Sequence, residues 1–96
     1  MTTFYVTAVL IGDEGHVEEC LVSDVVRTAD GFAIDNARPM PASEVVDLVV
    51  RGDQVLVWED DGNGGSRQNE KVIVLSGRIE RLDSEPGHLI YGLPQL

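Results

Sequence analysis

The segment from Glu59 to Glu70 has the oxygen-bearing side chains and the spacing of a calcium-binding loop. Glu59, Asp61 and Asn63 alternate along the chain, a glycine that permits a sharp turn follows, and Glu70 closes the segment. Carboxylate and amide oxygens at this spacing are the ligands that an EF-hand loop offers to calcium. The flanking sequences predict strands rather than helices. We therefore favour the competing interpretation, a hairpin loop rich in turn-forming residues.

A second group of potential ligands surrounds the single cysteine. His16, Glu18 and Cys20 would share one side of a strand, an arrangement compatible with zinc. A dedicated zinc site needs three or four converging ligands with supporting hydrogen bonds, so we expect no metal and no cofactor. The nearby acids should raise the pKa of Cys20 and suppress its thiolate, so a small core residue is expected there.

Residues suited to catalysis are present but stand in no recognisable motif. His16 and His88 are the two side chains able to act as bases near neutral pH. None of the serines lies in a nucleophile motif, and no glycine-rich phosphate cradle joins a strand to a helix. The sequence therefore predicts a protein that is not an enzyme. A small enzyme would require one of the two histidines to meet acids in a pocket.

The charge balance limits the classes of partner. Seventeen acidic residues against seven basic ones give the 96-residue chain a formal net charge of −10 at pH 7. A field of that sign repels phosphate backbones and anionic lipid headgroups, so we expect no binding to nucleic acid or membranes. It permits a cationic partner, although solubility explains the same acidity. A lone cysteine and short apolar runs favour a cytoplasmic location.

Periodicity predicts one α+β domain over residues 1–96, with a mainly antiparallel sheet of about five strands. We expect a bulge in the second strand, because neither of its faces is cleanly apolar. We expect a loop over 36–41, because its two prolines interrupt the hydrogen bonding of a β-ladder. Segments rich in β-branched and aromatic residues predict strands over 4–11, 17–26, 32–35, 54–58, 72–75 and 78–82.

One α-helix is expected over about 42–51, packed on one face of the sheet. Gly52 supplies a natural C-terminal stop. The apolar stripe that should face the sheet consists of Ala42, Val45, Val46, Val49 and Val50.

Aromatic and apolar residues near the end of the chain are candidate contact residues. The segment 88–96 is apolar enough to dock back onto the domain, and Tyr91 and Leu93 within it are candidates for an interface. Trp58 is a third candidate, although we favour the alternative that it packs under the helix.

Several short motifs resemble a bacterial family of small proteins, domain of unknown function 3892. The opening strand Tyr5-Val6-Thr7-Ala8-Val9, the step Gly52-Asp53 after the helix and the closing Leu89-Ile90-Tyr91-Gly92-Leu93-Pro94 carry the resemblance. Gly92 stands where we expect a polar residue in that family. The resemblance covers most of the chain and implies an α+β fold. It implies no activity and transfers no functional residues.

The leading hypothesis is a non-enzymatic module that binds another protein or associates with itself. Its contact surfaces would be the closing apolar segment and an unpaired edge of the sheet. One alternative is an acidic regulator that occupies a basic surface of a partner. Another is a calcium-binding loop or a small enzyme.

Overall fold

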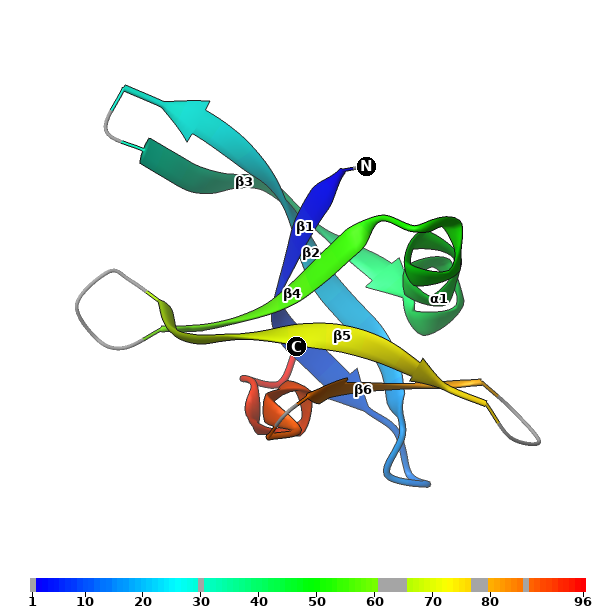
Figure 1. The fold of residues 1–96 in the computed structure, drawn as a ribbon. Helices are drawn as coiled ribbons and strands as arrows, with labels where there is room; N and C mark the ends of the chain where they lie inside the picture. The colour runs from blue at the N-terminus through cyan, green and yellow to red at the C-terminus, as the bar shows by residue number, and fades with distance from the viewer. Residues whose placement is uncertain (1, 30, 61–65, 77–79, 86) are drawn as a thin grey trace.

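A curled β-sheet forms the body of the molecule (Figure 1). This computed structural model describes residues 2–29, 31–60, 66–76, 80–85 and 87–96. The elements within those residues are β1 (Thr3–Ile11), β2 (Val17–Thr28), β3 (Gly31–Pro41), α1 (Ala42–Arg51), β4 (Gln54–Asp60), β5 (Ser66–Leu75), β6 (Arg81–Glu85) and the short 3-10 helix η1 (Leu89–Gly92). No helix in this part of the chain is long and apolar enough to cross a membrane.

The strands form one sheet in the order β3-β2-β1-β4-β5-β6. Neighbouring strands are antiparallel except β1 and β4, whose residues 3–6 and 54–57 run parallel. A parallel pair needs a long crossover connection, and β2, β3 and α1 together supply it. The α+β class with one helix is confirmed. The sheet is mixed and has six strands, where the sequence predicts about five.

β3 continues through residues 36–41, where the sequence predicts a loop. Pro39 and Pro41 both lie in the ladder with β2. Proline cannot donate a hydrogen bond to a ladder, but an edge strand tolerates it wherever the missing N–H faces away from the neighbouring strand. β3 lies at the edge of the sheet, and the loop prediction is wrong for that reason.

β6 extends through residues 83–85, beyond the end of the strand that the sequence predicts over 78–82. Antiparallel pairing with residues 71–75 of β5 holds this extension in the sheet. Residues 78 and 79 of the predicted strand lie outside the described residues.

The bulge expected in the second strand is confirmed. Leu10 and Ile11 of β1 pair with Glu19 and Val17 of β2, so Glu18 is an extra residue in β2. The alternation of side chains between the two faces of β2 therefore changes at this point.

The core lies on the inner face of the sheet, which α1 covers by contacting strands β2 to β6. The C-terminal segment with η1 completes it. The buried hydrophobic residues of this single cluster are Phe4, Val6, Val9, Val17, Cys20, Val22, Met40, Val45, Val46, Leu48, Val55, Val57, Val72, Leu82, Ile90 and Leu93.

α1 begins after Pro41, which occupies the N-cap position, and ends at Gly52 as predicted. Gly52 has a φ of 100°, a left-handed conformation that glycine adopts without steric cost. The N–H groups of Gly52 and Asp53 donate to the carbonyl oxygens of Val49 and Leu48 at 3.1 and 3.0 Å, and close the helix end.

The face of α1 that meets the sheet differs from the predicted stripe at two positions. Leu48 is 8% exposed and belongs to the core, whereas Val50 is 70% exposed. The helix carries apolar residues on most of its circumference, so periodicity alone does not determine which stripe is buried.

Replacement of these two residues by alanine tests the orientation of α1. Leu48→Ala should lower the free energy of unfolding by about 2–4 kcal/mol, because it removes buried methyl groups and leaves a cavity. Val50→Ala should change it by less than about 0.5 kcal/mol, because that side chain is mostly exposed. Urea denaturation followed by circular dichroism measures both variants. Equal losses would contradict the observed orientation.

Candidate functional site

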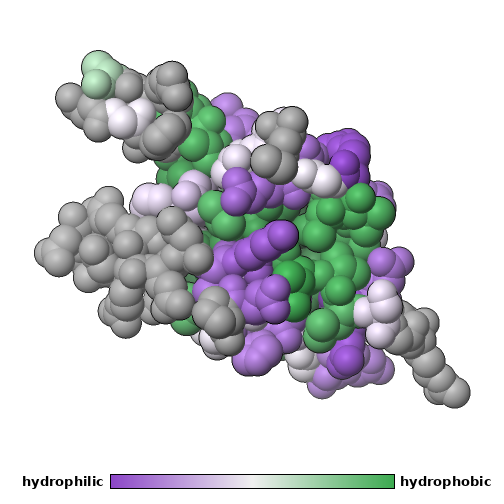
Figure 2. Space-filling model, in the orientation of Figure 1, coloured by the Kyte–Doolittle hydropathy of each residue, from purple (hydrophilic) through white to green (hydrophobic). Residues whose placement is uncertain are grey.

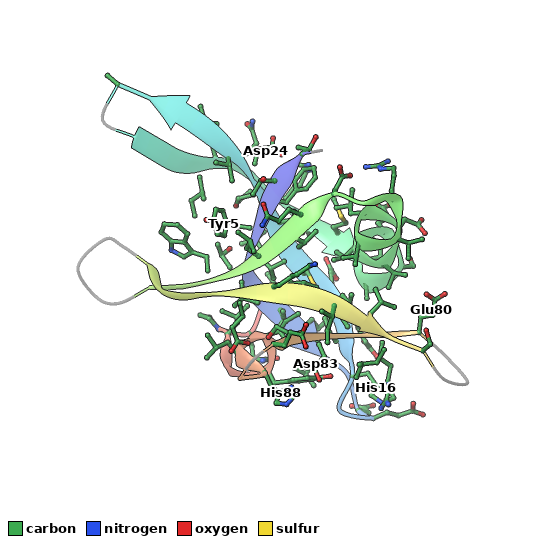
Figure 3. The ribbon with its side chains drawn as sticks, in the orientation of Figure 1. Tyr5, His16, Asp24, Glu80, Asp83 and His88 are labelled. Atoms are coloured by element: carbon green, nitrogen blue, oxygen red, sulfur yellow. The ribbon has the colours of Figure 1, made fainter. Side chains whose placement is uncertain are left out.

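The face of the sheet opposite α1 carries apolar side chains and has no helix packed on it among the described residues. We call the surface formed by Tyr5, Val25, Ile34, Leu56 and Trp58 the open face. Tyr5 pairs with Leu56 of β4 and with Ser23 of β2, and Val25 of β2 pairs with Ile34 of β3, so the surface continues across four strands. Tyr5 points away from α1 in Figure 3. Apolar surface also gathers where the β2–β3 hairpin leaves the body of the molecule (Figure 2).

An aromatic pair occupies the centre of the open face. The rings of Tyr5 and Trp58 meet edge to face, with centroids 5.0 Å apart and an interplanar angle of 84°. This geometry is favourable for two aromatic quadrupoles and holds both rings in defined orientations. Both side chains remain partly exposed. The alternative that Trp58 packs under the helix is therefore wrong, because Val55 and Val57 occupy the inner face of β4 and Trp58 takes the outer one.

Two adjoining hollows flank the aromatic pair, each with a volume of about 430 Å³. Ile34 and Trp58 line both of them. The first, the apolar hollow, is completed by Thr3, Tyr5, Val25, Gln54 and Leu56. The second, the polar hollow, is completed by Thr7, Ser23, Asp35, Asn36, Ala37 and Pro94. These volumes lie in the range of ligand pockets, but both hollows are open to solvent rather than enclosed.

A local distortion of β3 lies at the polar hollow, where residues 35–37 form part of the wall. Asn36 has a φ of 56°, and the register of β2 and β3 shifts beside it. The Asn36 N–H donates to Asp35 Oδ1 at 2.8 Å, and its side-chain amide donates to Asp24 at 3.3 Å. Arg38 donates to Asp24 Oδ1 at 3.2 Å and to the carbonyl oxygen of Asn36 at 3.1 Å. Arg38 thus pairs with Asp24, and Asp35, which lies directly across the ladder from Asp24, points to the same face of the sheet as this ion pair.

The C-terminal segment is held by a buried carboxylate, Glu70. Its Oε1 accepts hydrogen bonds from the Ser84 hydroxyl at 2.7 Å and from the Leu89 N–H at 2.8 Å, and its Oε2 accepts one from the Gly87 N–H. Burial alone raises the pKa of Glu70. The hydrogen bonds from Leu89, Ser84 and Gly87 outweigh burial, and the pKa lies below its ordinary value.

A second layer of hydrogen bonds surrounds this carboxylate. Ser84 Oγ accepts the N–H of Ile90 at 2.9 Å, and the Tyr91 hydroxyl donates to the Leu82 carbonyl oxygen at 3.0 Å. His88 Nδ1 lies 2.8 Å from Asp83 Oδ1. The hydrogen bond and negative charge of Asp83 raise the pKa of His88 above its ordinary value.

The last residues of the chain pair with β1 and contribute to the polar hollow. The N–H of Val9 donates to the Pro94 carbonyl oxygen at 3.0 Å, and the N–H of Leu96 donates to the Val9 carbonyl oxygen at 2.9 Å. The N–H of Ile11 donates to the Gln95 side chain at 3.2 Å. These contacts lie beyond the part of β1 that pairs with β4, and they bring Pro94 into the wall of the hollow.

The two candidate contact residues of the closing segment have different environments. Tyr91 is 38% exposed, and its hydroxyl is bound to the backbone of β6. Leu93 is 4% exposed and packs in the core, so its side chain is not available to a partner. The segment docks back onto the domain as expected. Because that docking uses Leu93, the prediction that Leu93 lies at an interface conflicts with its burial.

The sheet edges offer little for strand pairing. β3, at one edge, contains Pro39 and Pro41 and a bend at Asn36. β6, at the other edge, has five residues. Prolines, bends and short length are features that block edge-to-edge association. An unpaired edge is therefore a less suitable contact surface for a partner than the open face.

One of the four predicted calcium ligands, Glu70, is not available to bind an ion. Glu70 faces the interior and both of its oxygens accept hydrogen bonds, so it is not available to an ion. Asp61, Asn63 and the side chain of Glu59 lie outside the described residues. Among the side chains that are described, no three His, Cys, Asp or Glu residues are arranged to hold a metal ion.

His16, Glu18 and Cys20 are not brought together as zinc ligands. Cys20 lies in the core, where burial and then the charge of Glu19 raise its pKa to about 12, which confirms the expected small core residue. His16 Nε2 lies 3.3 Å from Arg81. Beside it is a hollow of about 400 Å³, the acidic hollow, lined by Asp13, Glu14, His16, Val17, Glu18, Glu80 and Arg81. His16 and Glu80 lie near the same end of the molecule in Figure 3.

Comparison with protein-family models, with curated proteins and with solved structures finds no significant match. The resemblance drawn from the sequence motifs therefore stays a prediction. The case for function depends on the geometry of the open face.

Replacement of Glu70 tests its role in holding the C-terminal segment. Glu70→Gln should lower the free energy of unfolding by about 1–3 kcal/mol at pH 7, because the amide leaves a buried donor without an acceptor. A lowered pKa contributes stability above the ordinary glutamate pKa of about 4.3, and that stability is lost as the pH falls through the folded value. The difference from wild type should thus shrink in acid. Urea denaturation between pH 7 and pH 3 measures it.

Glu85→Gln is a matched control, because Glu85 is exposed at the end of β6. It should cost less than about 0.5 kcal/mol. A difference between wild type and Glu70→Gln that stays constant with pH would contradict the assigned role.

The Asp83–His88 contact should be visible by NMR. His88 should titrate above its ordinary pKa of about 6.5, and Asp83→Asn should move the midpoint back toward that value. A raised pKa means that protonated His88 stabilises the fold below pH 6.5, and that this contribution is lost as the pH rises through the folded value. An unchanged midpoint in Asp83→Asn would show that the contact does not persist in solution.

Proposed function

We propose that this chain is a non-enzymatic module that binds another protein through the open face of its sheet. The observation that supports this most directly is the Tyr5–Trp58 pair, which lies partly exposed beside two hollows. Tyrosine and tryptophan supply large contact areas with few rotatable bonds, and they are enriched among residues that dominate binding energy. A contiguous apolar surface rimmed by polar groups is typical of an interaction site.

Charge favours a different protein over a second copy of this chain. Each copy carries a formal net charge of −10, so two copies repel one another as they approach. The same charge disfavours nucleic acid and anionic membranes as partners. The single cysteine is buried, which is compatible with the reducing cytoplasm that we propose as the location.

An acidic regulator is the second candidate function, and the acidic hollow is the observation that favours it. Four carboxylates, those of Asp13, Glu14, Glu18 and Glu80, line this hollow. Such a cluster could face a basic surface of a partner. Binding of this kind would weaken steeply with salt and would not depend on the aromatic pair.

Site-specific photo-crosslinking tests the open face against other surfaces. 4-Benzoylphenylalanine replaces Leu56 on the open face or, as a matched control, the exposed Val50 on α1. Cells of the source organism expressing each variant are irradiated. The Leu56 position should capture a distinct protein that the Val50 position does not capture. Adding Trp58→Ala to the Leu56 variant should reduce the captured amount at least tenfold.

Irradiation is repeated in a cell lysate at low and at high salt. Capture that survives Trp58→Ala but is lost when irradiation takes place at high salt would instead support the acidic regulator. Identical products from both positions, or none from Leu56, would contradict a protein-binding open face.

A further inference from the structure

We propose that an extended segment of the partner binds as a strand parallel to β1, in the place that residues 94–96 of this chain now occupy. We call this place, along β1 from Val9 to Ile11, the β1 slot. The inference rests on the proposed function and specifies how the partner is bound. The observation that carries it is an inner strand whose backbone is covered by three exposed residues, beside the hollow that Trp58 lines.

The β1 slot exists because β4 pairs with β1 over only part of its length. The parallel ladder joins residues 3–6 of β1 to residues 54–57 of β4. The register with β2 then shifts between Val6 and Ala8, and a bulge of this kind changes the side to which the following backbone groups point. Beyond the bulge, the backbone groups of β1 that face away from β2 need partners from another segment.

Residues 94–96 supply those partners as a short parallel strand. Val9 forms a parallel bridge with Gln95, in which the Val9 N–H donates to Pro94 at 3.0 Å and the Val9 carbonyl oxygen accepts from Leu96 at 2.9 Å. In a regular parallel ladder the Ile11 N–H would donate next to the Leu96 carbonyl oxygen. Here it donates to the Gln95 side chain at 3.2 Å. A longer, regular strand would form with its backbone a bond that this segment forms with a side chain.

Residues 94–96 can leave the β1 slot without disturbing the core. All three are exposed, and the side chain of Leu96 is 48% exposed. Leu93 before them is 4% exposed and packs in the core, and Glu70 holds the preceding turn. A segment with few buried contacts and exposed hydrogen bonds opens at low free-energy cost. A partner strand therefore competes with a weakly held segment and not with the fold.

The surroundings of the β1 slot indicate the side chains of the partner segment. Pro94 forms part of the wall of the polar hollow, which Trp58 also lines. A strand that replaces residues 94–96 places an apolar side chain where Pro94 now lies. Its preceding residues cannot follow Leu93, which fills the core, so they lie over the open face towards Trp58. The backbone bonds supply affinity in this mode of binding, and the apolar side chains supply specificity.

A different protein suits the β1 slot better than a second copy of this chain. Residues 94–96 of a second copy would form the same bonds that the chain already forms within itself, without the advantage of covalent attachment. Two copies also repel one another, because each carries a formal net charge of −10. The same charge disfavours an acidic segment, so the partner segment is apolar and not acidic.

Peptide selection on the full chain tests the proposal. A random-peptide phage library is selected against immobilised Leu96→Pro protein, and enriched peptides are synthesised and titrated by calorimetry. Leu96→Pro removes the N–H that donates to Val9, so residues 94–96 compete less well. The peptides should bind this variant about two- to tenfold more tightly than wild type. Leu96→Ala is the matched control, because it removes the same side chain and keeps the N–H. It should change the affinity by less than about twofold.

NMR of the peptide complex tests the direction of the bound strand. A nitroxide at the C-terminal end of the peptide should broaden the amide signals of Ile11 and Gly12, because a parallel strand runs in the same direction as β1. A nitroxide at its N-terminal end should broaden the indole signal of Trp58. The peptide should also slow amide hydrogen exchange at Val9 in Leu96→Pro. The reverse pattern of broadening would overturn the parallel strand.

The outcomes separate the β1 slot from the proposed function. Peptides that lose about thirtyfold or more of their affinity in Trp58→Ala, but bind wild type and Leu96→Pro equally, would overturn the slot and keep the protein-binding open face. Peptides that gain affinity in Leu96→Pro and are indifferent to Trp58→Ala would overturn the role of the open face and confine binding to the slot. No enrichment, or indifference to both substitutions, would overturn both. A wild-type dimer that Leu96→Pro dissociates would assign the slot to a second copy and overturn the proposal.

Discussion

The buried carboxylate of Glu70 organises the C-terminal quarter of the chain. An ionised group in a protein interior is stable only when donors surround it, and here the donors are the Ser84 hydroxyl and the N–H groups of Gly87 and Leu89. These groups lie 14 to 19 positions away in sequence, so the carboxylate joins β5 to the turn after β6. Once this turn is held, Ile90 and Leu93 enter the core. The last residues of the chain then form hydrogen bonds with β1, and Pro94 becomes part of the wall of the polar hollow.

The open face itself follows from the size of the chain and from its topology. One ten-residue helix covers the inner face of a six-stranded sheet. The crossover through β2, β3 and α1 places β4 beside β1. Tyr5 and Leu56 therefore become neighbours although they are 51 positions apart in sequence. An apolar surface results that no local segment could form alone, and each of the four strands that build it contributes at least one side chain.

Local signals were sufficient to predict most elements, and long-range contacts explain most of the failures. The end of α1 at Gly52 and the positions of the apolar strands depend on the conformational preferences of neighbouring residues. The sequence therefore predicts them. In the run Val55-Leu56-Val57-Trp58 both faces of β4 are apolar. The sequence there does not indicate which face α1 covers, and the prediction that Trp58 packs under the helix is wrong for that reason. The sequence offers Glu70 as a calcium ligand, and its burial could not be predicted, because no local pattern distinguishes a buried acid among seventeen.

The acidity of the chain and its exposed apolar face are consistent with one physical explanation. An open sheet face with two aromatic rings risks association between copies, because apolar surface gains free energy when it leaves water. Pro39 and Pro41 disfavour strand pairing at the β3 edge, and like charge opposes contact between the faces. The same charge does not oppose a basic partner. From composition alone, solubility and the selection of a partner are competing explanations of the acidity. Under the proposed function both would be effects of the same electrostatic field.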